Sequence, residues 1–86
     1  MFKVKSLPSF ERDFKKLPQI AQKKIDHEIL SFSSNPYPKN SKKLVGQKAA
    51  YRIKVGDYRL IYEVDADQHI VYLLRTAHRK DIYRSL

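Results

Sequence analysis

The stretch YRIKVGDYRLIY, residues 51–62, predicts a two-stranded β-hairpin and with it the core of the fold. Gly56-Asp57 is the expected two-residue turn, because glycine at the first central position suits a type II′ turn. A turn of this length fixes the pairing of the two strands residue by residue. The predicted pairs are Val55 with Tyr58, Lys54 with Arg59, Ile53 with Leu60, and Arg52 with Ile61.

The two faces of this hairpin differ in character. The apolar face carries Tyr51, Ile53, Val55, Tyr58, Leu60 and Tyr62. The other face puts Lys54 directly across from Arg59, with Arg52 two residues along. Like charges across a ladder are unfavourable, by a few tenths of a kcal/mol up to about 1. We therefore expect this face to bind an anion such as a phosphate, which supplies a counter-charge and several acceptor oxygens. The alternative is a solvated sheet face that Asp57 and Glu63 partly neutralise.

The composition predicts one small basic domain, residues 1–86, since 86 residues are too few for two domains. Eighteen Lys and Arg against nine Asp and Glu give a net charge of +9, which in so small a domain favours an anionic partner, most often nucleic acid. Seven of those cations and one anion lie between Lys39 and Arg59.

Several classes of protein are not expected. The absence of cysteine excludes disulfides and thiolate metal sites and is compatible with the cytoplasm. MFKVKS at the N-terminus does not resemble a signal peptide, and the apolar run IVYLL is far too short to span a bilayer. We expect a cytoplasmic protein without a membrane segment.

The N-terminal half predicts a strand and two helices. FKVKSL, residues 2–7, alternates apolar and polar residues like a half-buried strand. Residues 7–17 follow a helical spacing of Phe10, Phe14 and Leu17, with Ser9, or Ser6 with Pro8 in the first turn, as the expected cap. A second helix begins after Pro18, and its expected buried stripe is Ala21, Ile25, Ile29 and Phe32.

The C-terminal half predicts the rest of a sheet. SNPYPKNSKK, residues 34–43, is expected to be a loop, and residues 65–68 a second turn. HIVYLLR, residues 69–75, is apolar on both faces, as in a central strand. A basic tail follows, with one short helical turn. The order β, α, α, β, β, β predicts an α+β fold: a mostly antiparallel sheet of about four strands with a helical hairpin on one face.

The polar residues suggest a chemistry that needs no cofactor. The three histidines lack metal-binding spacing, and no acidic cluster resembles a metal site. Cations and a few proton carriers suit cleavage of RNA by its own 2′-hydroxyl, which needs a base, positive charge on the transition state and a proton for the leaving 5′-oxygen. Neighbouring cations disfavour the ammonium form of a lysine, which makes the hairpin lysine a candidate base. His78, in HRKDIY (residues 78–83), is a candidate acid or base, or simply an exposed histidine.

KLVGQKAAYRIKVGDYRLIYEV, the apolar strand and RTAHRKDIYR together resemble the RelE/ParE superfamily of toxins over nearly the whole chain. The RelE branch implies a metal-independent endoribonuclease that cuts mRNA in the ribosomal A site. The resemblance implies that Lys54 is the general base and that Arg59 stabilises the phosphate, while Arg52 occupies a basic position of the site that is often lysine. It also implies that Arg79 stabilises the transition state and protonates the leaving group. Tyr83 would stack on the substrate base, and His78 is a secondary candidate for the proton donor.

The resemblance also implies partners. They are a small acidic RelB-like antitoxin that wraps the toxin, mRNA on the ribosome, and operator DNA reached only through the antitoxin complex. Cations outside the catalytic set would contact RNA phosphates: Lys39, Lys42, Lys43 and Lys48. Two other functions remain open, which are inhibition of DNA gyrase, as in the ParE branch, and nucleic-acid binding without catalysis.

Overall fold

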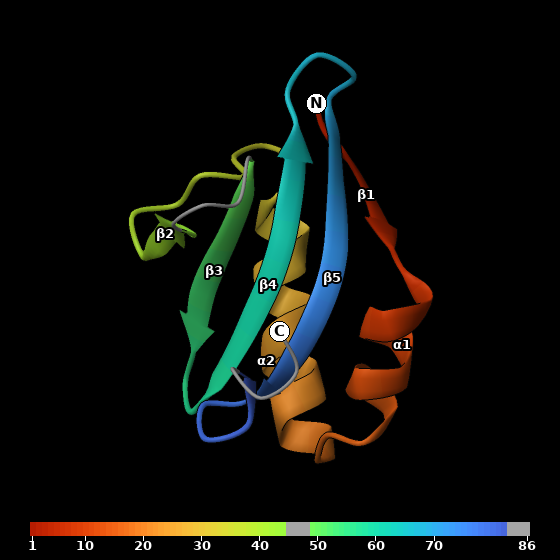
Figure 1. The fold of residues 1–86 in the computed structure, drawn as a ribbon, viewed down its shortest axis with the longest axis vertical. Coiled ribbons are helices and arrows are strands. Elements are labelled where there is room, and N and C mark those ends of the chain that lie inside the picture. Colours follow the sequence, from red (N-terminus) through yellow and green to blue (C-terminus); the bar gives the residue numbers. More distant parts are fainter. Residues whose placement is uncertain (45–48, 83–86) are drawn as a thin grey trace.

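Residues 51–62 form the predicted hairpin in the computed structural model, which describes residues 1–44 and 49–82 of the chain (Figure 1). Its strands are β3 (Ala50–Val55) and β4 (Tyr58–Asp65). All four predicted cross-strand pairs are confirmed, from Val55 with Tyr58 to Arg52 with Ile61. Gly56 has a φ of 62° whereas Asp57 has no positive φ, which fits the expected type II′ turn.

The hairpin belongs to a five-stranded sheet in the order β1-β5-β4-β3-β2. The remaining strands are β1 (Lys3–Ser6), β2 (Ser41–Lys43) and β5 (Ile70–His78). β1 and β5 run parallel and every other pair is antiparallel, so the predicted α+β fold with a mostly antiparallel sheet is confirmed. The prediction that residues 34–43 are all loop is wrong, because Ser41–Lys43 pairs with β3. Nothing in SKK favours a strand locally, and its pairing partners lie eight to twelve residues further along the chain.

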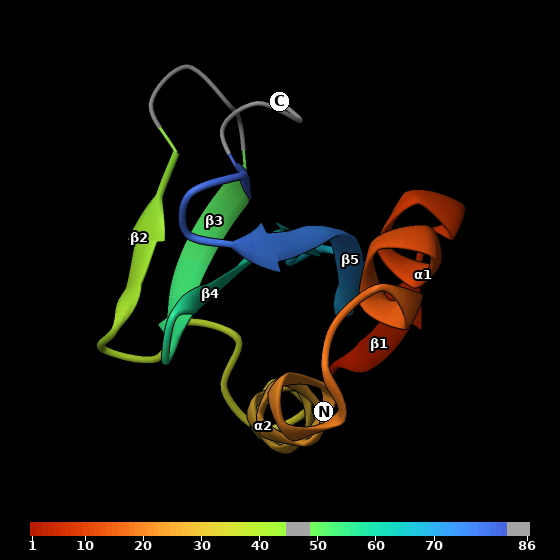
Figure 2. The same ribbon diagram turned by 90° about the horizontal axis from the view of Figure 1, so that it is seen from below.

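Two helices follow β1, as predicted. They are α1 (Pro8–Lys15) and α2 (Gln19–Ser31). Figure 2 shows α2 lying across one face of the sheet and α1 beside the β1–β5 edge. The expected serine caps are wrong, since Leu7 takes the N-cap position of α1 and no side chain caps it. Pro8 does occupy the first turn. The Ser9 hydroxyl instead donates across to the carbonyl of Leu74 in β5 (2.6 Å).

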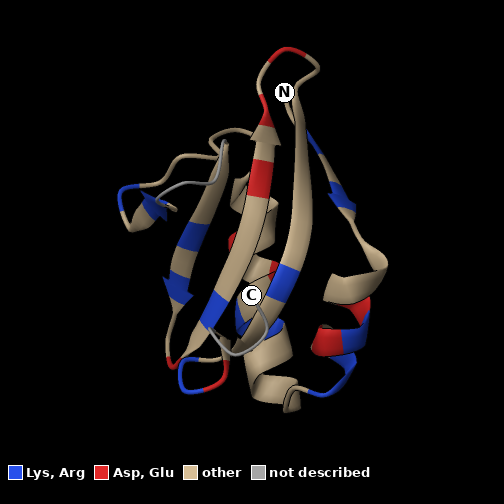
Figure 3. Cartoon of the chain, viewed as in Figure 1, with Lys and Arg blue, Asp and Glu red and all other residues tan. Residues whose placement is uncertain are grey.

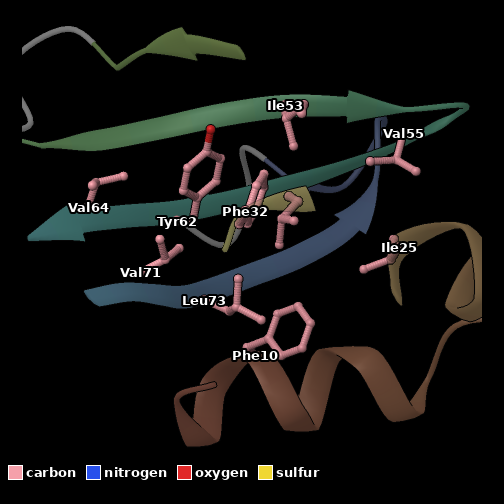
Figure 4. Close-up of a cluster of buried hydrophobic side chains, with 10 residues drawn as sticks. Phe10, Ile25, Phe32, Ile53, Val55, Tyr62, Val64, Val71 and Leu73 are labelled. Carbon is pink, nitrogen blue, oxygen red and sulfur yellow. The ribbon is translucent and has the colours of Figure 1, made fainter. Parts of the chain in front are cut away.

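The core lies between α2, α1 and the predicted apolar face of the hairpin (Figure 4). Ile25, Phe32, Ile53, Leu60 and Tyr62 are all fully buried. The ring of Phe32 lies 4.5 Å from that of Tyr62. The Tyr62 hydroxyl donates to the Pro36 carbonyl (2.8 Å), which ties the loop after α2 to the centre of the sheet.

β5 contains one extra residue relative to β4. Tyr62 is paired with Leu73 and the preceding Ile61 with Arg75, which leaves Leu74 without a partner on β4. Such a β-bulge reverses which sheet face the following side chains take. Val71 and Leu73 belong to the core on the helix side, and beyond the bulge it is Thr76, only 1% exposed, that turns to this side. No helix in the described ranges is long and apolar enough to cross a membrane.

Candidate nucleic-acid interface

The sheet face turned away from α2 is here called the outer face. Figure 3 shows that Lys and Arg residues occur on β3 and β4 near the hairpin turn, and we call them the cationic band. Lys54 on β3 and Arg59 on β4 are directly paired, so their side chains leave the sheet on the same side. Arg52 follows two residues from Lys54. A second cation pair joins β2 to β3, because Lys42 is paired with Arg52. The prediction of a loop at residues 34–43 did not include this pair. Two cross-strand cation pairs therefore lie side by side on one face.

The guanidinium of Arg59 is held over the hairpin turn. Its Nη1 donates to the carbonyls of Gly56 (3.1 Å) and Tyr58 (3.0 Å). These bonds fix the direction of the side chain without neutralising its charge, since both acceptors are uncharged. The positive charge of Arg59 is thus concentrated near the tip of the hairpin.

Lys54 is exposed, and its ammonium has no hydrogen bond or ion pair with any residue in the described ranges. The side-chain amide of Asn40 donates to the backbone carbonyl of Lys54 (3.4 Å) and leaves the ammonium group unoccupied. The side chain is therefore available to a ligand on the outer face.

The end of β5 is fastened to the same hairpin tip. The backbone N–H of Arg79 donates to the carbonyl of Asp57 (2.8 Å), although the two residues are 22 positions apart in sequence. Arg79 itself is exposed. The segment after β5 turns to the side of the sheet away from α2 (Figure 2). Arg79 thus joins Lys54 and Arg59 at one end of the molecule, whereas Tyr83 lies outside the described residues.

His78 takes the opposite side of the sheet. It is paired with Tyr58, whose ring packs against the core, and the two rings meet edge to face at 5.4 Å. Its Nδ1 accepts a hydrogen bond from the backbone N–H of Lys80 (3.2 Å). The β5 bulge is the cause, because it turns His78 toward the helices. The structure therefore does not bring His78 together with Lys54 and Arg59.

The other predicted RNA-binding lysines lie along β2 and the turn before it. Lys42 and Lys43 are exposed on β2, and Lys39 is exposed two residues before the strand begins. Lys42 extends the cationic band sideways from β3, whereas Lys43 is paired with Tyr51 of the apolar face and so leaves the sheet on the other side. Lys48 lies outside the described residues.

The other end of the sheet has the opposite charge. Glu63 and Asp65 lie at the far end of β4, and Asp67 lies in the turn to β5. β4 alone thus runs from Arg59 beside the hairpin turn to acidic residues at its other end. The cations of the outer face are gathered, not spread evenly over the molecule.

Sequence reasoning gave no role to an ion pair at the edge of β5. Arg75 emerges opposite Ile61, and Asp13 of α1 binds it with both oxygens, at 2.7 Å to Nε and 3.1 Å to Nη2. Burial by itself would raise the pKa of Asp13, but the hydrogen bonds from Arg75 and from the Thr76 N–H outweigh it and lower that pKa. No sequence pattern indicates this pair, since its members are 62 residues apart.

No group of three or more His, Asp or Glu residues suited to a metal ion occurs in the described part of the chain. What the site offers instead is permanent positive charge with directed N–H donors. Such a surface can bind phosphodiesters and stabilise an anionic transition state.

The sequence matches one toxin family over most of its length. The model of the family described as "ParE toxin of type II toxin-antitoxin system, parDE" matches residues 4–83. Toxin RelE3 of Methanocaldococcus jannaschii is 36% identical over 85 residues, which cover 94% of each chain.

Solved structures have the same fold. The archaeal RelE–RelB complex from Pyrococcus horikoshii contains a chain with a TM-score of 0.81 at 24% identity, covering 91% of this chain and 94% of its own. A chain in the RelB–RelE antitoxin–toxin complex from Methanococcus jannaschii has a TM-score of 0.75 at 30% identity, with coverage of 95% and 98%.

Proposed function

Because this chain belongs to the RelE/ParE superfamily of toxins from type II toxin–antitoxin systems, we propose that it is a metal-independent endoribonuclease that cleaves mRNA on the ribosome. One observation carries the proposal: Lys54 and Arg59 are paired on an open sheet face, with Arg79 fastened beside them. The crowded cations suit binding of a phosphate, and Lys54, which has no counter-ion among the described residues, can in addition serve as a proton acceptor. A site that must take a proton from RNA and stabilise a phosphorane needs both groups.

In this mechanism Lys54 takes the proton from the 2′-hydroxyl of the nucleotide before the cut. The 2′-oxygen then forms a bond to phosphorus, and the bond from phosphorus to the 5′-oxygen breaks. The products are a 2′,3′-cyclic phosphate and a free 5′-hydroxyl. Arg59 and Arg52 bind the phosphate oxygens, whose negative charge grows in the transition state.

Arg79 stabilises the same charge and donates the proton that the leaving 5′-oxygen requires, while Tyr83 stacks on the substrate base. His78 stays a secondary candidate for the proton donor. Its ring packs against Tyr58 on the helix side, which favours Arg79 for this role. A His78→Ala variant that keeps the parental rate would exclude the histidine.

The proposed partners follow from the same family. A small acidic antitoxin of the RelB kind would neutralise the cationic band, in line with the RelB–RelE complexes of similar fold. Lys39, Lys42, Lys43 and Lys48 would contact ribosomal or messenger RNA phosphates. Operator DNA would be bound only through the antitoxin complex. The setting is the cytoplasm, where translation takes place.

Primer extension on mRNA from cells that express the protein tests this proposal. We expect cuts in phase with the reading frame within translated regions, and none after Lys54→Ala or Arg79→Ala. Both variants should keep the fold and bind the antitoxin, which circular dichroism and co-purification check. Uncut transcripts in cells whose growth the parent protein arrests would refute the nuclease.

A second candidate function is inhibition of DNA gyrase, which the match to the ParE family model favours. A gyrase inhibitor would block supercoiling of a plasmid by purified gyrase and induce DNA damage while leaving transcripts whole. A module that only binds RNA would slow translation without producing fragments or DNA damage. The same cells therefore distinguish the three functions.

A further inference from the structure

Among the described residues, no strand pairs with the C-terminal half of β5 on its β1 side. β1 pairs with β5 only from Ile70 to Leu73, and β1 ends at Ser6. The backbone N–H of Leu7 still donates to the carbonyl of Leu73 (3.0 Å). Beyond that point the edge of β5 leads to His78 and Arg79 without a neighbouring strand to hold it.

Helix α1 replaces the missing strand with two side chains. Ser9 donates to the carbonyl of Leu74 (2.6 Å), the residue of the bulge, and Asp13 accepts from the backbone N–H of Thr76 (3.1 Å). Ser9 and Asp13 are four residues apart and therefore lie on the same face of the helix. Asp13 also binds Arg75 with both oxygens. A helix thus supplies the hydrogen bonds that keep this part of β5 in its bulged register.

Thr76 connects Asp13 to the strand that carries a catalytic candidate. Its hydroxyl donates to the backbone carbonyl of Arg59 (2.9 Å), and Thr76 is almost completely buried. Arg79, three residues further along, is joined to the hairpin turn. One carboxylate on α1 is therefore connected through Thr76 to the strand that carries Arg59 and through β5 to Arg79.

We propose that Asp13 is a positioning residue, which acts through Thr76 to hold Arg59 and Arg79 at the distance that phosphate cleavage requires. The inference rests on the proposed nuclease function. Bulges are enriched next to active sites, where they redirect side chains, and this bulge is the one that Ser9 and Asp13 secure. Asp13 has no direct part in the proposed chemistry, because its carboxylate is occupied by the Arg75 guanidinium and the Thr76 N–H.

The test compares Asp13→Asn with the parent in mRNA cleavage by a purified translating system. Asparagine keeps the size and one oxygen acceptor but loses the charge that holds Arg75. We expect kcat to fall about 10- to 100-fold, the range for small displacements of catalytic groups, with KM within about threefold of the parent's. Glu11→Gln is the matched control, since it removes a carboxylate from the exposed face of the same helix and should leave both constants unchanged.

Two further variants separate positioning from loss of folding. Thr76→Val removes the hydroxyl at almost constant volume and should lower kcat, whereas Thr76→Ser restores the donor and should recover most of the rate. Arg79→Ala should leave no cuts detectable in cells, but its residual rate can be measured by single-turnover cleavage at high concentrations of purified protein. In that background Asp13→Asn should cost much less than it does in the parent, because one of its two targets is already gone. Rates are normalised to the folded fraction from antitoxin titration.

Parental kcat in Asp13→Asn, or equal losses in both backgrounds, would overturn the inference while leaving the nuclease intact. A parent protein that cuts no mRNA would overturn the proposed function instead.

Discussion

Lys54 and Arg59 face each other across the β3–β4 ladder on the sheet surface that the helices leave open. Stability alone gives no reason for this pair, because like charges directly across a ladder repel each other. Lys42 and Arg52 repeat the arrangement one strand along. The sheet therefore has an electrostatic cost in its free state that an anionic ligand removes on binding.

Replacing Lys54 by alanine should change activity and stability in opposite directions. Loss of the base should lower the cleavage rate about 100-fold or more. Relief of repulsion should leave the free energy of unfolding unchanged or raise it by up to about 1 kcal/mol. Urea denaturation and single-turnover cleavage measure the two effects. Lys5→Ala is the control, because Lys5 is exposed on β1, beyond β4 and β5 from the site; a similar loss of rate there would contradict the assignment.

Lys42→Ala should weaken RNA binding without changing the rate at which bound RNA is cleaved. Each phosphate contact that is lost lowers the slope of log affinity against log salt by about 1. Fluorescence anisotropy with a short single-stranded RNA over a range of salt concentrations gives this slope. An unchanged slope would mean that β2 lies outside the RNA path.

Tyr62→Phe should destabilise the protein by about 1 to 3 kcal/mol, because it leaves the carbonyl of Pro36 without its donor. Burial raises the pKa of Tyr62 to about 12, so the phenol stays protonated in the folded protein well above the value of about 10 for free tyrosine. The stabilisation should therefore persist below pH 10 and disappear as pH rises toward 12. Thermal unfolding of parent and variant between pH 7 and 11 measures it, and equal melting temperatures at neutral pH would refute the bond.

Asp13→Asn should change how the free energy of unfolding depends on pH in the acidic range. The pKa of Asp13 is lowered on folding, so the carboxylate stabilises the native state above its unfolded pKa of about 3.9 and ceases to do so as pH falls through the folded value. The gap in free energy of unfolding between parent and variant should be widest near neutral pH and close below about pH 4. Urea titrations at several pH values test this, with Glu11→Gln as the control. A gap that widens in acid would contradict the assignment.

The hairpin was predictable because the residues that determine it are neighbours in the sequence. A two-residue turn with glycine at its first position fixes the register, and the alternation of YRIKV and YRLIY then fixes the faces. The spacing of Ala21, Ile25 and Phe32 likewise predicted the buried side of α2.

The features that sequence reasoning missed depend on distant partners. β2 is a strand only because β3 offers it an edge, and SKK has no strand pattern of its own. The bulge at Leu74 lies within a run that is apolar on both faces of the strand. Because apolar and polar residues do not alternate there, the sequence could not show on which side of the sheet His78 lies. Ser9 was expected to cap its own helix and instead bonds to a strand 65 residues away.

The acidic end of β4 determines how the molecule meets a polyanion. The strand has eight residues, so its ends lie about 25 Å apart, roughly three screening lengths in physiological salt. Asp65 and Asp67 thus scarcely weaken the field around Arg59, whereas Glu63, four residues along the strand, lies about 13 Å from it. All three carboxylates repel phosphates from their own end of the sheet. As the protein approaches a polyanion, this asymmetry of charge should orient it with the hairpin tip toward the phosphates. The first productive contact should then be made by the hairpin tip.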